Sequence, residues 1–365
     1  MNIIIFIVIL LVLVLVHEFG HFWTAKKFGI RVDEFGFGFP PKAMTLFKKG
    51  ETEYTLNWLP IGGFVKIFGE NPDDENTNGV DRDRSFVNKP KWQQAIVLVA
   101  GIVANILLAW VLFSVGFMSG LPTAVESVSD GVKLQDKSLI VMSVLPDSPA
   151  FKAELESGDK IIKLTAGKDV LTEATPTTLR EFIVSHDELI TVEYERNSEL
   201  LTTEILPTKN DADSKPSIGI SMAEIGILKL PFFSALVEGA KFTWNVTEGT
   251  VVGLYGIIKS AVTGAGNVKD SITGPVGMVG IVGDAYQFGF AYLLSFAALI
   301  SVNLAVINLI PFPALDGGRL FFLLIEKIKG SRLNPNVANV ANMVGFWLLI
   351  LLMLFVTYND IVKLI

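Results

Sequence analysis

The chain has 365 residues, of which 50% are hydrophobic and only 18% are charged. An ordinary soluble protein has about 25% charged residues, so this composition argues against a wholly soluble chain. The formal net charge of −7 provides no basic surface, which speaks against nucleic acid as a partner. Cysteine is absent, and this excludes disulfides, thiolate zinc sites and cysteine nucleophiles. Histidine occurs three times, so imidazole chemistry must use His17, His21 or His186.

Four long apolar runs predict transmembrane helices. Three of them are free of charged residues over more than the length needed to cross a bilayer, at 95–117, 288–315 and 337–358. The fourth, at 3–25, reaches that length only if it contains His17, Glu18 and His21. No positive region precedes it and two lysines follow it, which is not the pattern of a cleaved signal peptide.

The distribution of Lys and Arg predicts the orientation. Basic residues are concentrated at 26–91, between the first two spans, and at 319–332, after the third. Such loops remain in the cytoplasm, so both termini and residues 118–287 are expected outside.

The region between the second and third spans has two parts. Residues 124–208 combine short β-rich runs at 139–145, 160–165, 190–194 and 201–206 with one predicted helix at 177–185. A polar hinge follows at 210–216, and then 232–261 predicts a helix on or near the membrane surface, because charged residues interrupt its apolar pattern. We therefore expect four segments, at 1–117, 118–215, 216–287 and 288–365.

The first span ends in the sequence His17-Glu18-Phe19-Gly20-His21. Residues four apart lie on one face of a helix, so the two imidazoles can share a metal ion, and Glu18 can act as a general base. The alternative is a pair of solvated histidines at a helix end. A charged group at membrane depth costs roughly 2.5 kcal/mol or more, which favours the metal site.

A catalytic zinc usually has three protein ligands. Cysteine is absent and His186 is expected on the opposite side of the membrane, so the third ligand should be a carboxylate near a membrane boundary. Asp316 fits, because the first and third spans run in the same direction and place it at the depth of His17 and His21.

The end of the third span contains two prolines and two asparagines. Pro311 and Pro313 should break the helix just before Asp316, either to line a polar cavity or as an ordinary helix stop. The amides of Asn303 and Asn308 can bond a substrate backbone, or alternatively hold neighbouring helices together.

The two motifs, H-E-F-G-H at 17–21 and N-L-I-P-F-P-A-L-D-G at 308–317, resemble the signatures of site-2 proteases, the intramembrane zinc metalloproteases. The bacterial members similar to regulator of sigma-E protease match best, over nearly the whole chain. The resemblance implies Zn²⁺ held by His17, His21 and Asp316, with Glu18 as catalytic base. It also implies that Asn303 and Asn308 bind the substrate.

The same resemblance implies the fold class, a polytopic α-helical membrane protein with four transmembrane helices. Gly36-Phe37-Gly38, the run at 53–59 and Gly62-Gly63 resemble the family's membrane re-entrant β-hairpin, which is thought to pair with an extended substrate. Residues 118–215 resemble one extracytoplasmic PDZ-like α+β domain, where the enterobacterial type has two. The second span reads Gly101-Ile102-Val103-Ala104-Asn105 and lacks the proline usual after that glycine.

The function implied is regulated intramembrane proteolysis in the bacterial cytoplasmic membrane. The substrates expected are single-span proteins in the lipid bilayer, such as anti-sigma factors or remnant signal peptides, cut at an active site toward the cytoplasmic side. Two other classes compete with this interpretation. A non-catalytic adaptor would bind peptides and need no zinc, and a zinc transporter would carry more His, Asp or Glu through its spans.

Overall fold

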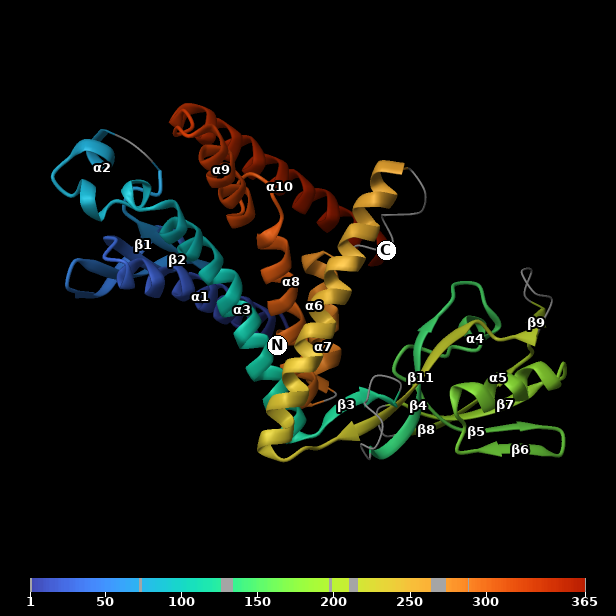
Figure 1. Ribbon diagram of the computed structural model, residues 1–365. Helices are drawn as coiled ribbons and strands as arrows, with labels where there is room; N and C mark the ends of the chain where they lie inside the picture. The colour runs from blue at the N-terminus through green and yellow to red at the C-terminus, as the bar shows by residue number, and fades with distance from the viewer. Residues whose placement is uncertain are drawn as a thin grey trace. The chain divides into compact units, whose positions relative to one another are not determined.

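The computed structural model describes residues 2–71, 74–125, 134–196, 199–209, 216–263, 274–287 and 289–364. The chain forms two compact units (Figure 1). Residues 1–116 and 232–365 make up the first, which we call the helical unit. Residues 117–231 make up the second, which we call the sheet unit.

Within the described residues, four helices are long and apolar enough to cross a membrane, and they confirm the predicted spans. They are α1 (Asn2–Lys27), α3 (Lys91–Ser119), α8 (Phe290–Leu309) and α10 (Pro335–Leu364). The third is shorter than the predicted run at 288–315, because Pro311 and Pro313 cannot continue the helix and α8 ends at Leu309. The predicted break before Asp316 is therefore present.

Shorter helices complete the helical unit. They are α2 (Asp74–Asn78), α7 (Pro275–Gln287) and α9 (Asp316–Lys329), with two 3₁₀ turns at Arg82–Arg84 and Phe86–Asn88. The predicted helix at 232–261 is present as α6 (Phe232–Thr263). Its first half packs on the bundle, since Trp110 Nε1 of α3 donates to the Leu236 carbonyl at 2.8 Å and a Cβ on Gly239 would meet Ser114 Oγ at 2.3 Å.

The predicted hairpin is formed by β1 (Val32–Lys49) and β2 (Thr52–Ile67), which pair antiparallel. Both strands bend, so that Glu34 to Phe37 pair on one side with 53–56 and on the other with 63–66. Residues 63–67 therefore form an outer edge of this small sheet, and β2 packs against α1. A hydrophobic cluster that includes Ala25, Ile30, Val32 and Val97 lies between the helices and the sheet.

The sheet unit is PDZ-like. Its main sheet has the order β3-β11-β4-β5-β7-β8, with β6 paired to β5 and a separate β9-β10 pair. The strands are β3 (Leu121–Ala124), β4 (Gln135–Val144), β5 (Lys160–Ala166), β6 (Asp169–Thr172), β7 (Ile190–Arg196), β8 (Glu199–Ile205), β9 (Thr208–Lys209), β10 (Pro216–Ser217) and β11 (Ile220–Leu228). The helices are α4 (Pro149–Lys152) and α5 (Pro176–Ser185). Leu179 and Ile183 of α5 are buried with Leu164 and Val192 of the sheet.

The four β-rich runs and the helix at 177–185 are confirmed by β4, β5, β7, β8 and α5. The expected segment boundary at 215/216 falls before β11, which pairs with β3 and β4 and thus belongs to this sheet. The compact unit accordingly continues to Pro231. His186 is the C-cap residue of α5, within the sheet unit and outside the cluster of His17, His21 and Asp316.

One buried ion pair stabilises the sheet unit. Arg196 donates from Nε to Asp159 Oδ1 at 2.7 Å and from Nη2 to Asp159 Oδ2 at 2.8 Å, and the Asp159 side chain is 1% exposed. These hydrogen bonds raise the pKa of the Arg196 guanidinium above its ordinary value. Because Asp159 has no access to water, it depends on this arginine for its charge compensation.

We expect Arg196→Leu to lower the free energy of unfolding of the sheet unit by about 3 kcal/mol, because it leaves a buried carboxylate unpaired. Hydrogen exchange of the β5 and β7 amides measures the loss. Arg180→Leu is the matched control, since Arg180 is exposed and makes no ion pair with the described residues. Equal exchange rates in both variants would contradict the prediction.

Candidate metal centre

The two histidines lie on one face at the end of α1. They are one helical turn apart and each is 6% exposed, so both imidazoles are buried inside the helical unit. Gly20 lies between them in sequence, and a Cβ there would come within 2.4 Å of the Ala100 carbonyl oxygen. The glycine in the motif therefore lets α1 approach the backbone of α3 closely.

Asp316 is the first residue of α9, and the loop that precedes it is tightly folded. Ala314 has φ of +75°, and its N–H donates to Asn342 Oδ1 of α10 at 3.2 Å. A Cβ on Gly317 would come within 2.3 Å of the Leu309 and Ile310 carbonyl oxygens, and one on Gly318 within 2.2 Å of the Phe312 carbonyl oxygen. The two glycines after Asp316 are thus required for the reversal that turns its carboxylate toward α1.

Three ligand atoms converge at the centre. His17 Nε2 lies 3.0 Å from Asp316 Oδ2, His21 Nε2 lies 3.2 Å from the same oxygen, and the two imidazole Nε2 atoms are 3.1 Å apart. A tetrahedral zinc with bonds of roughly 2.0–2.1 Å separates its ligand atoms by about 3.3 Å. The triangle therefore has the size and the nitrogen and oxygen donors that zinc requires.

Hydrogen bonds from α3 orient both rings. His21 Nδ1 lies 2.7 Å from the Val97 carbonyl oxygen, which can only accept, so Nδ1 carries the hydrogen and Nε2 keeps a lone pair for a metal. His17 Nδ1 lies 3.3 Å from Asn105 Nδ2, and the buried Asn105 Oδ1 has no hydrogen-bond partner among the described residues. A Cβ on Gly101 would lie 2.4 Å from His21 Nε2.

Sequence reasoning did not assign these α3 residues to the site. Val97, Gly101 and Asn105 repeat every four residues and face the histidines from one side of the helix. The spacing from Gly101 to Asn105 was visible in the sequence. Only the packing of α3 on α1 shows that this face contacts the imidazoles.

Glu18 is held at the edge of the β-sheet. Its Oε2 accepts a hydrogen bond from the Val65 N–H of β2 at 3.0 Å, and its Oε1 makes no hydrogen bond with the described residues. The nearby Arg319, one turn after Asp316, is paired with another carboxylate, because it forms an ion pair with Glu70. Glu18 therefore has one fixed oxygen and one that is free to accept a proton.

The two asparagines of α8 have different surroundings. Asn303 Oδ1 accepts a hydrogen bond from Thr250 Oγ1 of α6 at 3.2 Å, which is a contact between helices. Asn308 is partly buried, and its side chain makes no hydrogen bond with the described residues. The amide of Asn308 is thus available to a ligand, whereas the carbonyl oxygen of Asn303 already has a partner.

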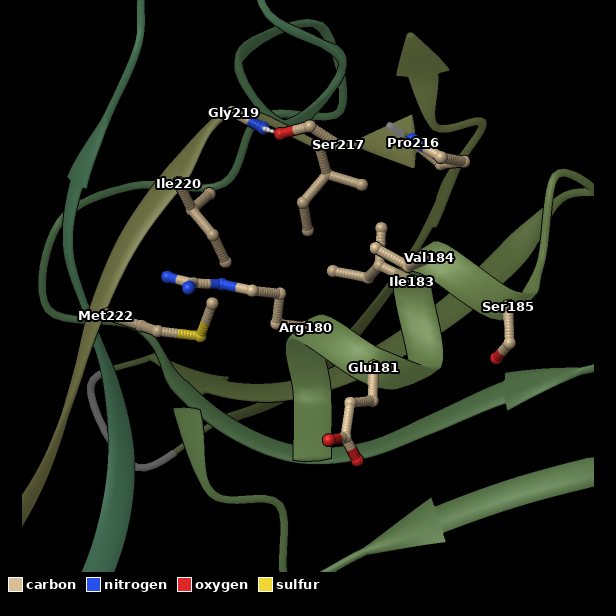
Figure 2. A pocket seen from close by; sticks show the side chains of 11 residues that line it. Arg180, Glu181, Ile183, Val184, Ser185, Pro216, Ser217, Gly219, Ile220 and Met222 are labelled. Carbon is tan, nitrogen blue, oxygen red and sulfur yellow. Dashed lines mark hydrogen bonds between the residues drawn. The ribbon is translucent and has the colours of Figure 1, made fainter. Parts of the chain in front are cut away.

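The sheet unit contains a groove of about 580 Å³ between α5 and the segment from β10 to β11. Arg180 reaches from α5 toward Ile220 and Met222, while Glu181 turns away (Figure 2). Residues 220–224 of β11 pair with β4, whereas β3 pairs only with 225–228. Among the described strands, the other edge of 220–224 is consequently unpaired.

A metal centre of two histidines and one carboxylate, with a glutamate beside it, in a chain with four helices apolar enough to cross a membrane defines a zinc metalloprotease of the site-2 protease class. The chain belongs to Peptidase family M50, whose match covers residues 5–352. It is thus a multi-pass membrane protein with zinc as its cofactor.

Three similar proteins match this chain over almost its full length, and one solved structure matches part of it. A Clostridium perfringens protein named as a putative zinc metalloprotease is 37% identical over 96% of this chain and 95% of its own. The regulator of sigma-E protease RseP of Escherichia coli is 30% identical over 98% of both chains. The zinc metalloprotease RasP of Geobacillus kaustophilus is 30% identical over 99% of this chain and 98% of its own. The PDZ domain of an SdrC-like protein from Listeria monocytogenes is 25% identical over 25% of this chain and 93% of its own, with a TM-score of 0.22.

We expect Gly101→Ala to lower zinc affinity at least about tenfold, because the added methyl group meets His21 Nε2 and must displace a ligand. Zinc per purified chain at limiting free metal is the measurement. Gly253→Ala is the matched control, since a Cβ at this helical glycine has no neighbour within 4 Å. Full zinc occupancy in Gly101→Ala would contradict the prediction.

Proposed function

We propose that this chain hydrolyses peptide bonds within or beside the transmembrane segments of single-span proteins. The observation that carries the proposal is the convergence of His17, His21 and Asp316 next to Glu18 inside an apolar helical unit. We assign the first three as zinc ligands and Glu18 as the catalytic base. Bound zinc would supply Lewis-acid polarisation of the scissile carbonyl.

Glu18 would move the proton. Oε2 is fixed by the Val65 N–H, so Oε1 is the oxygen that accepts a proton from the attacking water and then donates it to the leaving amine. The fixed hydrogen bond limits rotation of the carboxylate, which keeps Oε1 aimed in one direction. Proton transfer by a positioned carboxylate typically contributes 10²–10⁴-fold to a rate, that is, roughly 3–5 kcal/mol.

The outer edge of β2 would hold the substrate in extended form. A helix hides its carbonyl groups in internal hydrogen bonds, so a transmembrane substrate must unwind before it can be cut. Among the described strands, residues 63–67 are paired with β1 on one side only, and Val65 links this edge to Glu18. An extended substrate that adds to this edge lies beside the base, and we propose that the hairpin re-enters the membrane for this purpose.

The asparagines of α8 would bind the substrate backbone as well. Asn308 supports this role, because its amide has no hydrogen-bond partner among the described residues. Asn303 would contribute its amide nitrogen, since its oxygen accepts from Thr250.

We propose the arrangement across the membrane that the distribution of basic residues predicts. The sheet unit and both termini would be extracytoplasmic, in a bacterial cytoplasmic membrane, with the metal centre toward the cytoplasmic side. The helical unit, at 1–116 and 232–365, would carry the chemistry, and the sheet unit, at 117–231, would be the PDZ-like domain. Anti-sigma factors and remnant signal peptides are the substrate classes that we propose.

We expect Glu18→Gln to retain about one zinc per chain and to lose cleavage of a co-expressed single-span protein by roughly 10³-fold, because glutamine cannot take a proton. Mass spectrometry of the cleavage products and zinc analysis of the same sample measure both effects. His17→Ala is the companion variant, in which zinc and cleavage are lost together. Undiminished cleavage by Glu18→Gln would contradict the mechanism.

The groove in the sheet unit would select substrates through Arg180. This arginine has no ion-pair partner among the described residues and faces the unpaired edge of β11, so an extended extracytoplasmic segment with an acidic side chain fits there. We expect Arg180→Glu to slow cleavage of a substrate with such a segment several-fold and to favour one with lysine instead. The test uses two substrates that differ only in carrying an acidic residue or a lysine in this segment. If the ratio of their cleavage rates is the same for Arg180→Glu and the parent, Arg180 does not select substrates.

A further inference from the structure

The buried amide of Asn105 contacts one of the histidines. Asn105 is 0% exposed on α3, with Nδ2 placed 3.3 Å from His17 Nδ1 and Oδ1 left without a hydrogen-bond partner among the described residues. The oxygen and nitrogen of an amide have nearly the same shape, so their assignment follows from the groups they face. For Asn105 the assignment therefore depends on whether His17 Nδ1 is a hydrogen-bond donor or an acceptor.

His17 determines which amide atom fits. Its Nε2 faces Asp316 and His21 at the centre, so zinc binding uses the lone pair of Nε2. A neutral imidazole has one hydrogen, which must then lie on Nδ1. An Nδ1–H group needs an acceptor, and an amide NH₂ group cannot accept. With the nitrogen of Asn105 toward His17, two donors would face each other.

We infer that Asn105 presents its Oδ1 to the Nδ1–H of His17 in the zinc-loaded protein and is the positioning residue that fixes this imidazole in its metal-binding tautomer. The inference rests on the proposed role of His17 as a zinc ligand. Asn105 does not contact the metal itself, since it acts through the far nitrogen of the ring. Partners of this kind raise the basicity of the ligand and hold the ring in one orientation.

The second histidine has the equivalent arrangement. His21 Nδ1 donates to the Val97 carbonyl oxygen at 2.7 Å, two helical turns before Asn105 on the same face of α3. Gly101 lies midway, where a side chain would collide with both rings. Thus α3 would supply one oxygen acceptor to each imidazole, from the backbone for His21 and from a side chain for His17.

A hydrogen bond from α8 holds the backbone of Asn105. Ser301 Oγ of α8 donates to the Asn105 backbone carbonyl at 2.8 Å, which links α3 to the helix that leads toward Asp316. One atom of the amide stays without a partner in either orientation. Coordination of zinc by His17 outweighs the cost of one unpaired amide atom, so the metal decides which atom that is.

Zinc affinity in two variants tests the inference, in full-length protein with Glu18→Gln to prevent self-cleavage. Asn105→Leu removes the acceptor, and we expect zinc affinity by chelator competition to fall roughly 10–100-fold. Asn105→Asp keeps an oxygen toward His17 whether it is ionised or neutral, so its affinity should stay within about threefold of the parent. Ser301→Ala is the control for packing, because it touches the Asn105 backbone without touching His17.

The tautomer has a direct readout besides affinity. Imidazole ¹⁵N shifts of the zinc-loaded parent should show a protonated Nδ1 on His17, and this measurement does not depend on how well a variant folds. Zinc bound by Asn105→Leu as tightly as by the parent, or an unprotonated Nδ1, would overturn the inference. A parent protein that binds no zinc would instead overturn the ligand assignment on which the proposed function rests.

Discussion

The structure depends on the meeting of three lone-pair donors in an apolar environment. Asp316 lies about 300 residues after His17 and His21 in the chain, and each of the three is costly to bury among apolar helices without a partner. Zinc bound at protein sites contributes about 10–16 kcal/mol in small peptides, whereas an unsatisfied buried polar group costs about 1–3 kcal/mol. The metal site can therefore offset the burial of these polar groups, and the surrounding helices are arranged so that the three ligands meet.

Glycine residues let the helices around the metal centre approach one another closely enough for the three ligands to meet. Gly20 lets α1 approach Ala100 of α3, Gly101 leaves room for the imidazoles, and Gly317 with Gly318 lets α9 turn back on the end of α8. Each glycine faces a backbone oxygen or a ring at a distance that no side chain tolerates. Glu18, the base in the proposed mechanism, is held by a hydrogen bond from the Val65 N–H of β2.

The motifs allowed much of the site to be predicted, for physical reasons. The spacing of His17 and His21 is a property of any helix, and the lack of cysteine narrowed the third ligand to a carboxylate such as Asp316. The contribution of α3 was not predicted, since contacts between helices depend on which faces meet. The strand β11 was missed for a similar reason, because its partners β3 and β4 lie far upstream in the sequence.

Residue types and hydrophobic run lengths are local properties, so the donor types at the candidate metal centre and the number of long apolar helices could be predicted from the sequence. It also determined where α8 must stop, since proline cannot continue a helix. Three features became visible only in the folded chain: Val97 and Asn105 face the imidazoles, Val65 holds Glu18, and α6 packs on α3 and α8. These contacts join residues distant in the chain, and their geometry is set by packing across helices rather than by any local pattern.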